Sequence, residues 1–217
     1  MEVNNFLLLK KLLKFENRDD FYFLQILQRS KDNPDLGANN RLIKAYSVGS
    51  IEYLNKKEKE IKLLCKTFNA RAYIHLTKRS YKDVALEMLQ NLVQRIRCDQ
   101  MEEVYRCFTT ACGISYQKED KSWIVDIDGN VDHRTINTIL RFIETECEPI
   151  GPKFIALVPT VNGHHLITTP FNLQKFSEQY PEIDVHKNPL LLHSKQISSG
   201  NLKFFSICSI SNSYLSP

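Results

Sequence analysis

The chain has 217 residues, of which 42% are hydrophobic and 25% charged, a composition typical of globular proteins and not of disordered or collagen-like ones. Its 29 basic and 25 acidic residues give a formal net charge of +4, which permits an anionic partner without requiring one. The longest apolar run, residues 6–9, is far shorter than the ~20 residues of a membrane span. Because the first residues also do not resemble a signal peptide, we expect a cytoplasmic protein with no membrane association.

The first half of the chain alternates strand-like and helix-like segments. Residues 6–14 fit a short helix or an entry strand. Aromatic and branched residues predict strands at 21–28, 41–48 and 71–77. Apolar residues at helical spacing predict helices at 50–68, with Ser50 as N-cap, and at 80–97, and a third helix at 102–111. We expect residues 1–120 to form an N-terminal α/β lobe.

The second half predicts strands at 123–128, 154–159 and 164–170, short strands at 183–186 and 190–193, and helices at 132–147 and 173–180. Asn162-Gly163 is a strong signal for a two-residue hairpin turn. We therefore expect an α+β fold, with helices packed on an antiparallel or mixed sheet. This core would span residues 121–193, preceded by the smaller N-terminal lobe and followed by a C-terminal tail, 194–217.

The six cysteines form no CxxC pair, and no Cys/His pair at zinc-finger spacing accompanies Cys107 and Cys112. In a protein without a secretory signal, we expect them to be free thiols and not zinc ligands.

Two aspartates stand at the end of the apolar strand predicted at 123–128. Because side chains alternate along a strand, Asp126 and Asp128 point to one face, with Cα atoms ~6.6 Å apart. Two such carboxylates repel each other unless a cation or hydrogen bonds compensate them, and Mg²⁺ or Mn²⁺ would do so. The alternative is that the strand ends there and the acids cap a turn at Gly129.

Histidines follow the predicted hairpin turn, and further charged groups follow later in the chain. His164 and His165 leave the turn on opposite faces, and we expect His165 to lie near the aspartates, where it could hydrogen-bond a phosphate. Asp184 could complete a metal site and Lys187 could face an anion, although both also suit a polar surface. Three carboxylates, an imidazole and an ammonium group suit two-metal phosphoryl transfer.

The order of these motifs resembles that of the archaeo-eukaryotic primase (primase-polymerase) superfamily. The matching motifs, within residues 121–193, are Val125-Asp126-Ile127-Asp128, Gly163-His164-His165 and Ile183-Asp184. The pattern at 159–165 is also similar to that of short phage and gut-bacterial proteins, which would place the chain in a bacterial or phage-infected cell. The resemblance implies an RRM-like catalytic core, with Asp126, Asp128 and Asp184 as catalytic ligands of two Mg²⁺ or Mn²⁺ ions. It also implies nucleotide contacts from His165, with His164 and Lys187 as further candidates.

The resemblance thus implies a metal-dependent, primase-like nucleotidyltransferase of DNA replication. Its partners would be nucleotides and single-stranded DNA or RNA, while nothing in the sequence identifies a helicase partner. Arg71 and Lys78 are expected to contact a template strand, since they stand at a basic strand end.

Other functions fit part of the same sequence. Residues 125–131 resemble the haloacid-dehalogenase phosphatase signature, in which Asp126 would be the nucleophile and Asp128 the general acid/base. His75-Leu76-Thr77 matches the H-x-T of two-histidine phosphoesterases. A catalytically inactive, RRM-like nucleic-acid-binding module would instead use aromatic and basic side chains as a stacking and phosphate-binding surface. The candidates for that surface are Phe21, Tyr22, Phe23, Tyr46, Tyr53, Tyr73, Arg71, Lys78 and Arg79.

Overall fold

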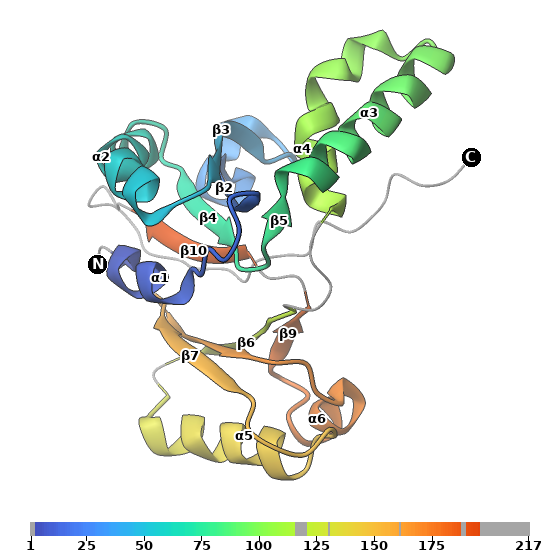
Figure 1. Ribbon diagram of the computed structural model, residues 1–217. Coiled ribbons are helices and arrows are strands. Elements are labelled where there is room, and N and C mark those ends of the chain that lie inside the picture. The colour runs from blue at the N-terminus through green and yellow to red at the C-terminus, as the bar shows by residue number, and fades with distance from the viewer. Residues whose placement is uncertain (1–2, 116–120, 130, 161, 188–189, 196–217) are drawn as a thin grey trace. The chain divides into compact units, whose positions relative to one another are not determined.

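The computed structural model describes residues 3–115, 121–129, 131–160, 162–187 and 190–195 (Figure 1). The expected α+β class is confirmed, since helices accompany two antiparallel sheets. The described residues divide into two compact units, the first within residues 3–122 and 191–195 and the second within residues 123–190.

The first unit is built on a sheet with the strand order β1-β10-β4-β2-β3, in which β5 pairs with β2. Its strands are β1 (Val3–Asn4), β2 (Asp20–Gln28), β3 (Arg41–Val48), β4 (Arg71–His75), β5 (Arg79–Ser80) and β10 (Leu190–Lys195). Its helices are α1 (Phe6–Leu12), α2 (Ile51–Thr67), α3 (Tyr81–Arg97) and α4 (Cys107–Ile114), with the 3-10 helices η1 (Ser30–Asp32), η2 (Pro34–Leu36) and η3 (Met101–Arg106). Figure 1 shows α3 and α4 side by side, running away from the sheet.

Local sequence signals define most of these elements. Ser50 caps α2 as expected, because its side chain accepts a hydrogen bond from the Tyr53 backbone N–H. The helix expected at 102–111 differs: η3 comes first, and α4 begins only at Cys107. Glu103 lies in η3 and pairs with Arg95 of α3 and with Arg106, at 2.7 and 3.4 Å. These ion pairs link the 3-10 turn to the end of α3.

The C-terminal boundary of the expected core differs from the observed one. Strand β10 joins the first sheet, where Val3 pairs with Lys195 and Asn4 with Ser194 in antiparallel register. A boundary at residue 193 therefore cuts through a strand of the first unit. Contrary to expectation, that unit is the larger of the two by residue number. Most of the expected tail, residues 196–217, lies outside the described residues.

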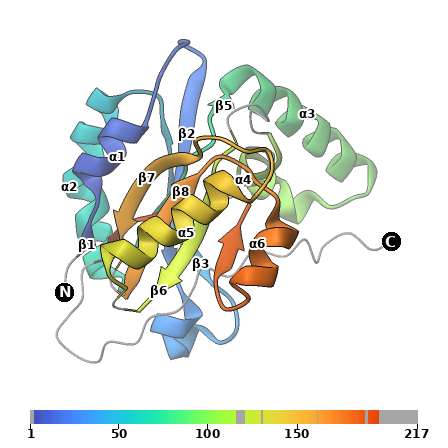
Figure 2. The same cartoon turned by 90° about the horizontal axis from the view of Figure 1, so that it is seen from below.

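The second unit has the element order β-α-β-β-α-β. Its elements are β6 (Trp123–Asp128), α5 (His133–Thr145), β7 (Phe154–Pro159), β8 (Gly163–Thr168), α6 (Leu173–Gln179) and β9 (Asp184–His186). The strand order is β7-β8-β6-β9, and neighbouring strands are antiparallel. Figures 1 and 2 show α5 and α6 on the same face of this sheet. The narrower expectation of an RRM-like core stays a prediction.

The core of the second unit lies between these helices and the sheet. Strand residues Val125, Ile127 and Leu166 pack there with residues of α5 and α6 such as Ile139 and Phe176. Because side chains alternate along a strand, this packing fixes which residues of β6 and β8 point to the opposite face. In the part of the chain that the structure describes, no helix has the length and apolar character needed to cross a membrane.

Candidate functional site on the second sheet

Asp126 lies at the centre of a row of polar side chains that crosses three strands. It pairs with His165 of β8 on one side and with Asp184 of β9 on the other. Side chains directly opposite each other in antiparallel strands have Cβ atoms about 4.5–5.5 Å apart. Asp128 lies two residues further along β6 and points to the same face. The three aspartates and His165, which are up to 58 positions apart in sequence, therefore meet on one sheet face.

This face is the one on which neither α5 nor α6 packs (Figure 2). Val125 and Ile127 alternate with the aspartates and belong to the helix-covered core. Asp128 and Asp184 are exposed on this face, whereas Asp126 and His165 are only 8% and 5% exposed. A substrate could therefore reach Asp128 and Asp184 without displacing the helices of the unit.

Gly163 sets the close approach of the β7–β8 hairpin to β6. It pairs with Asp128, and a Cβ atom at this position would lie 2.0 Å from the Ile127 carbonyl oxygen. The Gly129 N–H donates a hydrogen bond of 2.7 Å to the Asn162 carbonyl, which fastens the turn to the end of β6. Only a residue without a side chain allows this approach, so Gly163 fixes the register that brings His165 to Asp126.

The Asp126 carboxylate faces two imidazoles. The distance from His165 Nε2 to Asp126 Oδ1 is 3.3 Å, and that from His186 Nε2 to Asp126 Oδ2 is 4.0 Å. The other ring nitrogen of His165, Nδ1, is buried and has no hydrogen-bond partner among the described residues. A buried polar atom without a partner is costly, which makes Nδ1 a candidate contact for a ligand that enters the site.

Sequence reasoning assigned no role to His186. The signal was present in Asp184-Val185-His186, since residues two apart in a strand share a face. What the sequence did not supply was the register, in which His186 pairs with Ile124 and so lies diagonally across from Asp126.

The neighbouring carboxylates make it harder for one another to lose a proton. The pKa of Asp128 lies above its usual value because burial disfavours the charged form and because Asp126 and Asp184 are nearby, although His165 acts in the opposite direction. Strand β6 does end at Asp128, and Gly129 follows with a φ of 92°, so the strand end that the turn alternative requires is present, while a capping role of Asp128 stays a prediction. Asp126, in contrast, lies inside the strand.

Two of the candidate nucleotide contacts lie elsewhere in the second unit. His164 points to the helix-covered face, where its ring centroid is 6.2 Å from that of His133, and burial and His133 lower its pKa. The Lys187 ammonium lies 5.5 Å from the centroid of the Trp123 ring, at the end of β6 far from Asp128. His164 thus lies on the opposite face from the aspartates, as strand alternation led us to expect, and Lys187 does not lie beside them.

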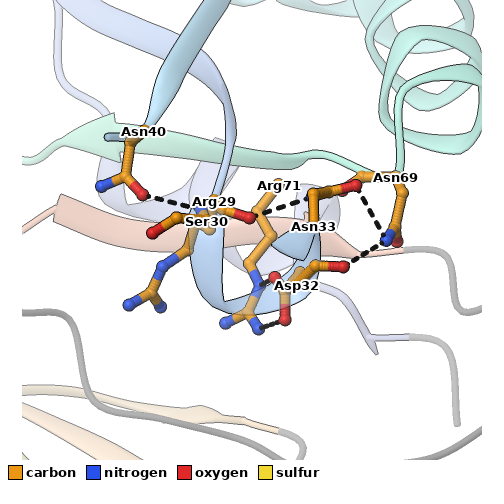
Figure 3. Close-up of polar contacts among 7 residues, drawn as sticks. All are labelled: Arg29, Ser30, Asp32, Asn33, Asn40, Asn69 and Arg71. Atoms are coloured by element: carbon orange, nitrogen blue, oxygen red, sulfur yellow. Dashed lines mark hydrogen bonds and ion pairs between the residues drawn. The ribbon is translucent and has the colours of Figure 1, made fainter. Parts of the chain in front are cut away.

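The expected template contacts of Arg71 and Lys78 are also wrong, because both side chains are buried and paired. The Arg71 guanidinium donates two hydrogen bonds of 2.6 Å to the Asp32 carboxylate (Figure 3), and the residue is only 4% exposed. Lys78 contacts Glu16 at 2.9 Å and Asp20 at 3.6 Å. A guanidinium or ammonium already neutralised inside the protein is a poor phosphate ligand.

The proposed stacking surface is mostly interior. Five of its six aromatic residues are buried, and Tyr53 is half-buried. Arg79 donates hydrogen bonds to the carbonyls of Cys112 and Thr77. These side chains hold the first unit together and offer no stacking platform. His75 is half-buried in that unit, and burial together with Arg79 lowers its pKa to about 3.

The donor chemistry of the site fits a hard divalent cation. Carboxylate oxygens are the preferred protein ligands of Mg²⁺ and suit Mn²⁺, and a cation would relieve the repulsion that raises the pKa of Asp128. As the side chains stand, however, no group of three or more His, Cys, Asp or Glu residues in the described ranges could hold a metal ion. Asp126 is turned towards its imidazoles, so metal binding would require it to change partners. The five cysteines that the structure describes are free thiols, as expected.

Comparison of the chain with protein families, with curated proteins and with solved structures found no match.

Proposed function

We propose that the second unit carries the active site of a metal-dependent, primase-like nucleotidyltransferase that acts on nucleotides or nucleic acid. The observation that carries the proposal is the meeting of Asp126, Asp128, Asp184 and His165 on the face opposite the packed helices. The order of the motifs along the chain, which resembles that of the primase-polymerase superfamily, agrees with it.

In this proposal the residues have separate roles. Asp126, Asp128 and Asp184 hold Mg²⁺ or Mn²⁺, with Asp126 as the shared ligand because it lies between the other groups. Bound there, the metal ions would stabilise charge on the phosphates and activate the attacking hydroxyl. His165 would offer Nδ1, which has no partner among the described residues, to a triphosphate oxygen.

The other candidate functions receive less support. The phosphatase signature would use a later lysine beside its aspartates, and the ammonium of Lys187 lies over Trp123 instead. A pure binding module would need the aromatic surface whose members are mostly buried. The aspartate face is therefore the better candidate for chemistry.

The proposal is tested by nucleotide incorporation with the purified full-length chain. Primed and unprimed single-stranded DNA and RNA are incubated with ribonucleotides or deoxynucleotides and Mn²⁺ or Mg²⁺. We expect metal-dependent products, and a loss of at least about a hundredfold in Asp126→Asn and Asp184→Asn, because each removes a metal ligand. Glu178→Gln is the matched control, since Glu178 is exposed on α6 and outside the site.

Manganese binding, followed by electron paramagnetic resonance, gives a second measurement that does not depend on the substrate chosen. Wild type and Glu178→Gln should bind Mn²⁺, and Asp126→Asn should bind it more weakly. Absence of Mn²⁺ binding by wild type, or equal incorporation by all variants, would refute the proposal. Turnover of p-nitrophenyl phosphate that is lost in Asp126→Asn would favour the phosphatase instead.

A further inference from the structure

Helix α3 exposes a regular stripe of large apolar side chains. Leu86, Leu89, Val93 and Ile96 are 51%, 54%, 55% and 54% exposed. Their spacing of three, four and three residues places them on one side of the helix. This is the a/d spacing of a coiled-coil seam.

The stripe is additional to the side of α3 that packs within the protein. Val84 is buried and Met88 and Leu92 are partly buried, and Val84 and Met88 contribute to the core with Phe21 and Phe23. One helix therefore has two apolar sides, of which only one is used inside the first unit. Exposed apolar patches of this kind mark interaction surfaces more often than chance would place them.

The charges at the two ends of the stripe indicate what covers it. Asp83 stands beside its N-terminal end and Arg97 beside its C-terminal end, and both are exposed. If a second α3 lies antiparallel, with Leu86 opposite Ile96 and Leu89 opposite Val93 of the copy, Asp83 lies beside the Arg97 of the other copy at both ends. In a parallel arrangement with the same seam, Asp83 and Arg97 of one helix would lie on the opposite side of the seam from those of the copy, so these charges would form no pairs.

We propose that two copies of the chain associate through their α3 helices, antiparallel, with the stripe Leu86, Leu89, Val93 and Ile96 as the buried seam. The same patch then serves both copies, as a two-fold interface requires. Opposite dipole directions in the two helices favour the same arrangement. This association is independent of the nucleotidyltransferase proposal, since it uses none of the residues of that site.

Sedimentation equilibrium of the full chain over a range of concentrations tests the association. Wild type should show a monomer–dimer equilibrium. Leu89→Glu should raise the dissociation constant at least about a hundredfold, because it places two carboxylates in an apolar seam. Gln94→Glu adds the same charge to an exposed position of α3 outside the stripe and should leave the dimer intact.

A charge exchange tests the orientation and the identity of the partner. Asp83→Arg should weaken the dimer roughly fivefold to tenfold, since it replaces two attractive pairs with repulsive ones, and the double variant Asp83→Arg/Arg97→Asp should restore it. Circular dichroism of each variant shows that α3 is still folded.

Three results would overturn the proposal. They are a wild-type chain that stays monomeric at every concentration reached, a dimer that Leu89→Glu leaves unchanged, and a double exchange that gives no rescue. If the full chain stays monomeric and a chain without residues 196–217 dimerises, this segment, and not a second copy, covers the stripe in the full chain.

Discussion

Gly163 shows how one residue determines the position of a catalytic candidate. Its missing side chain lets the backbone of the hairpin lie against Ile127 and Asp128, and His165 follows two residues later in register with Asp126. The local sequence predicted the turn, but it could not show why glycine is required there. That reason lies in a contact with a strand about 35 residues earlier in the chain.

Gly163→Ala should lower the free energy of unfolding by about 1–3 kcal/mol, because the added methyl group forces the backbone of β6 or β8 to shift. The measurement is urea denaturation followed by circular dichroism. The control is Gly113→Ala in α4, where nothing lies within 4 Å of the added Cβ and the free energy should be unchanged or higher by up to about 1 kcal/mol. Equal effects at the two positions would contradict the close approach.

The raised pKa of Asp128 predicts a pH dependence in the metal-free protein. The folded state holds the Asp128 proton to higher pH than the unfolded chain does, so stability falls as pH rises through the interval between the two pKa values. Asparagine does not titrate, so Asp128→Asn should gain stability relative to wild type between about pH 3.5 and neutral pH.

Asp132→Asn should change the pH dependence of stability in the opposite direction, so it serves as the comparison. Hydrogen bonds from Thr135 lower the pKa of Asp132, so its contribution is present above the unfolded pKa and is lost as pH falls. This variant should lose stability relative to wild type as pH rises. Denaturation at several pH values measures both variants. If the stability difference from wild type changed with pH in the same direction for both, the assigned pKa shifts would be contradicted.

At the scale of the elements, the second unit depends on a single packed face. The apolar residues Ile136, Ile139 and Ile143 of α5, three and four positions apart, all point towards the sheet. This periodicity was visible in the sequence, and the strands at 41–48, 123–128 and 154–159 were predicted to the residue as β3, β6 and β7. Alternation, spacing and turn residues are local properties, which is why these elements could be predicted.

Ile143→Ala should lower the free energy of unfolding by about 2–5 kcal/mol, because it leaves a cavity beneath α5. Ile143 is fully buried, whereas Ile155 of β7 is 40% exposed. Ile155→Ala removes the same atoms and should cost at most about 1 kcal/mol. The fluorescence of Trp123, the only tryptophan, follows this unit because its ring contacts Phe171. Similar costs for the two variants would show that α5 does not pack as described.

The site residues that the sequence placed wrongly share one cause. Arg71, Lys78 and Lys187 were expected at a ligand site because of their charge, and the structure pairs them with Asp32, with Glu16 and with the Trp123 ring. Those partners are distant in sequence, and a local pattern carries no information about them. The three aspartates do lie on one sheet face, as strand alternation and motif order led us to expect, and their role stays a prediction.

For the whole molecule, the main feature is that the first unit is discontinuous. Strand β10 lies between β1 and β4, so the first sheet is complete only when residues from both ends of the chain meet. The second unit is continuous over residues 123–190. Its core can therefore form without the C-terminal strand.

Truncation tests this division of the chain. A chain that ends at residue 189 lacks β10, so β1 loses the strand with which it pairs. We expect the midpoint temperature of its unfolding, measured by circular dichroism, to fall further below that of the full chain than the midpoint temperature measured by Trp123 fluorescence. A chain that ends at residue 195 keeps β10 and is the control. Equal falls in both signals would contradict separate packing of the two units.

Sheet order also has a consequence for synthesis on the ribosome. Translation delivers β2, β3 and β4 early, and the whole of residues 123–190 must emerge before the strand that separates β4 from β1 becomes available. Throughout that interval the nascent protein presents an open edge at β4, the kind of edge that recruits neighbouring strands. The order of synthesis thus requires that this edge be protected by a chaperone, or exposed only briefly by fast translation, until β10 arrives.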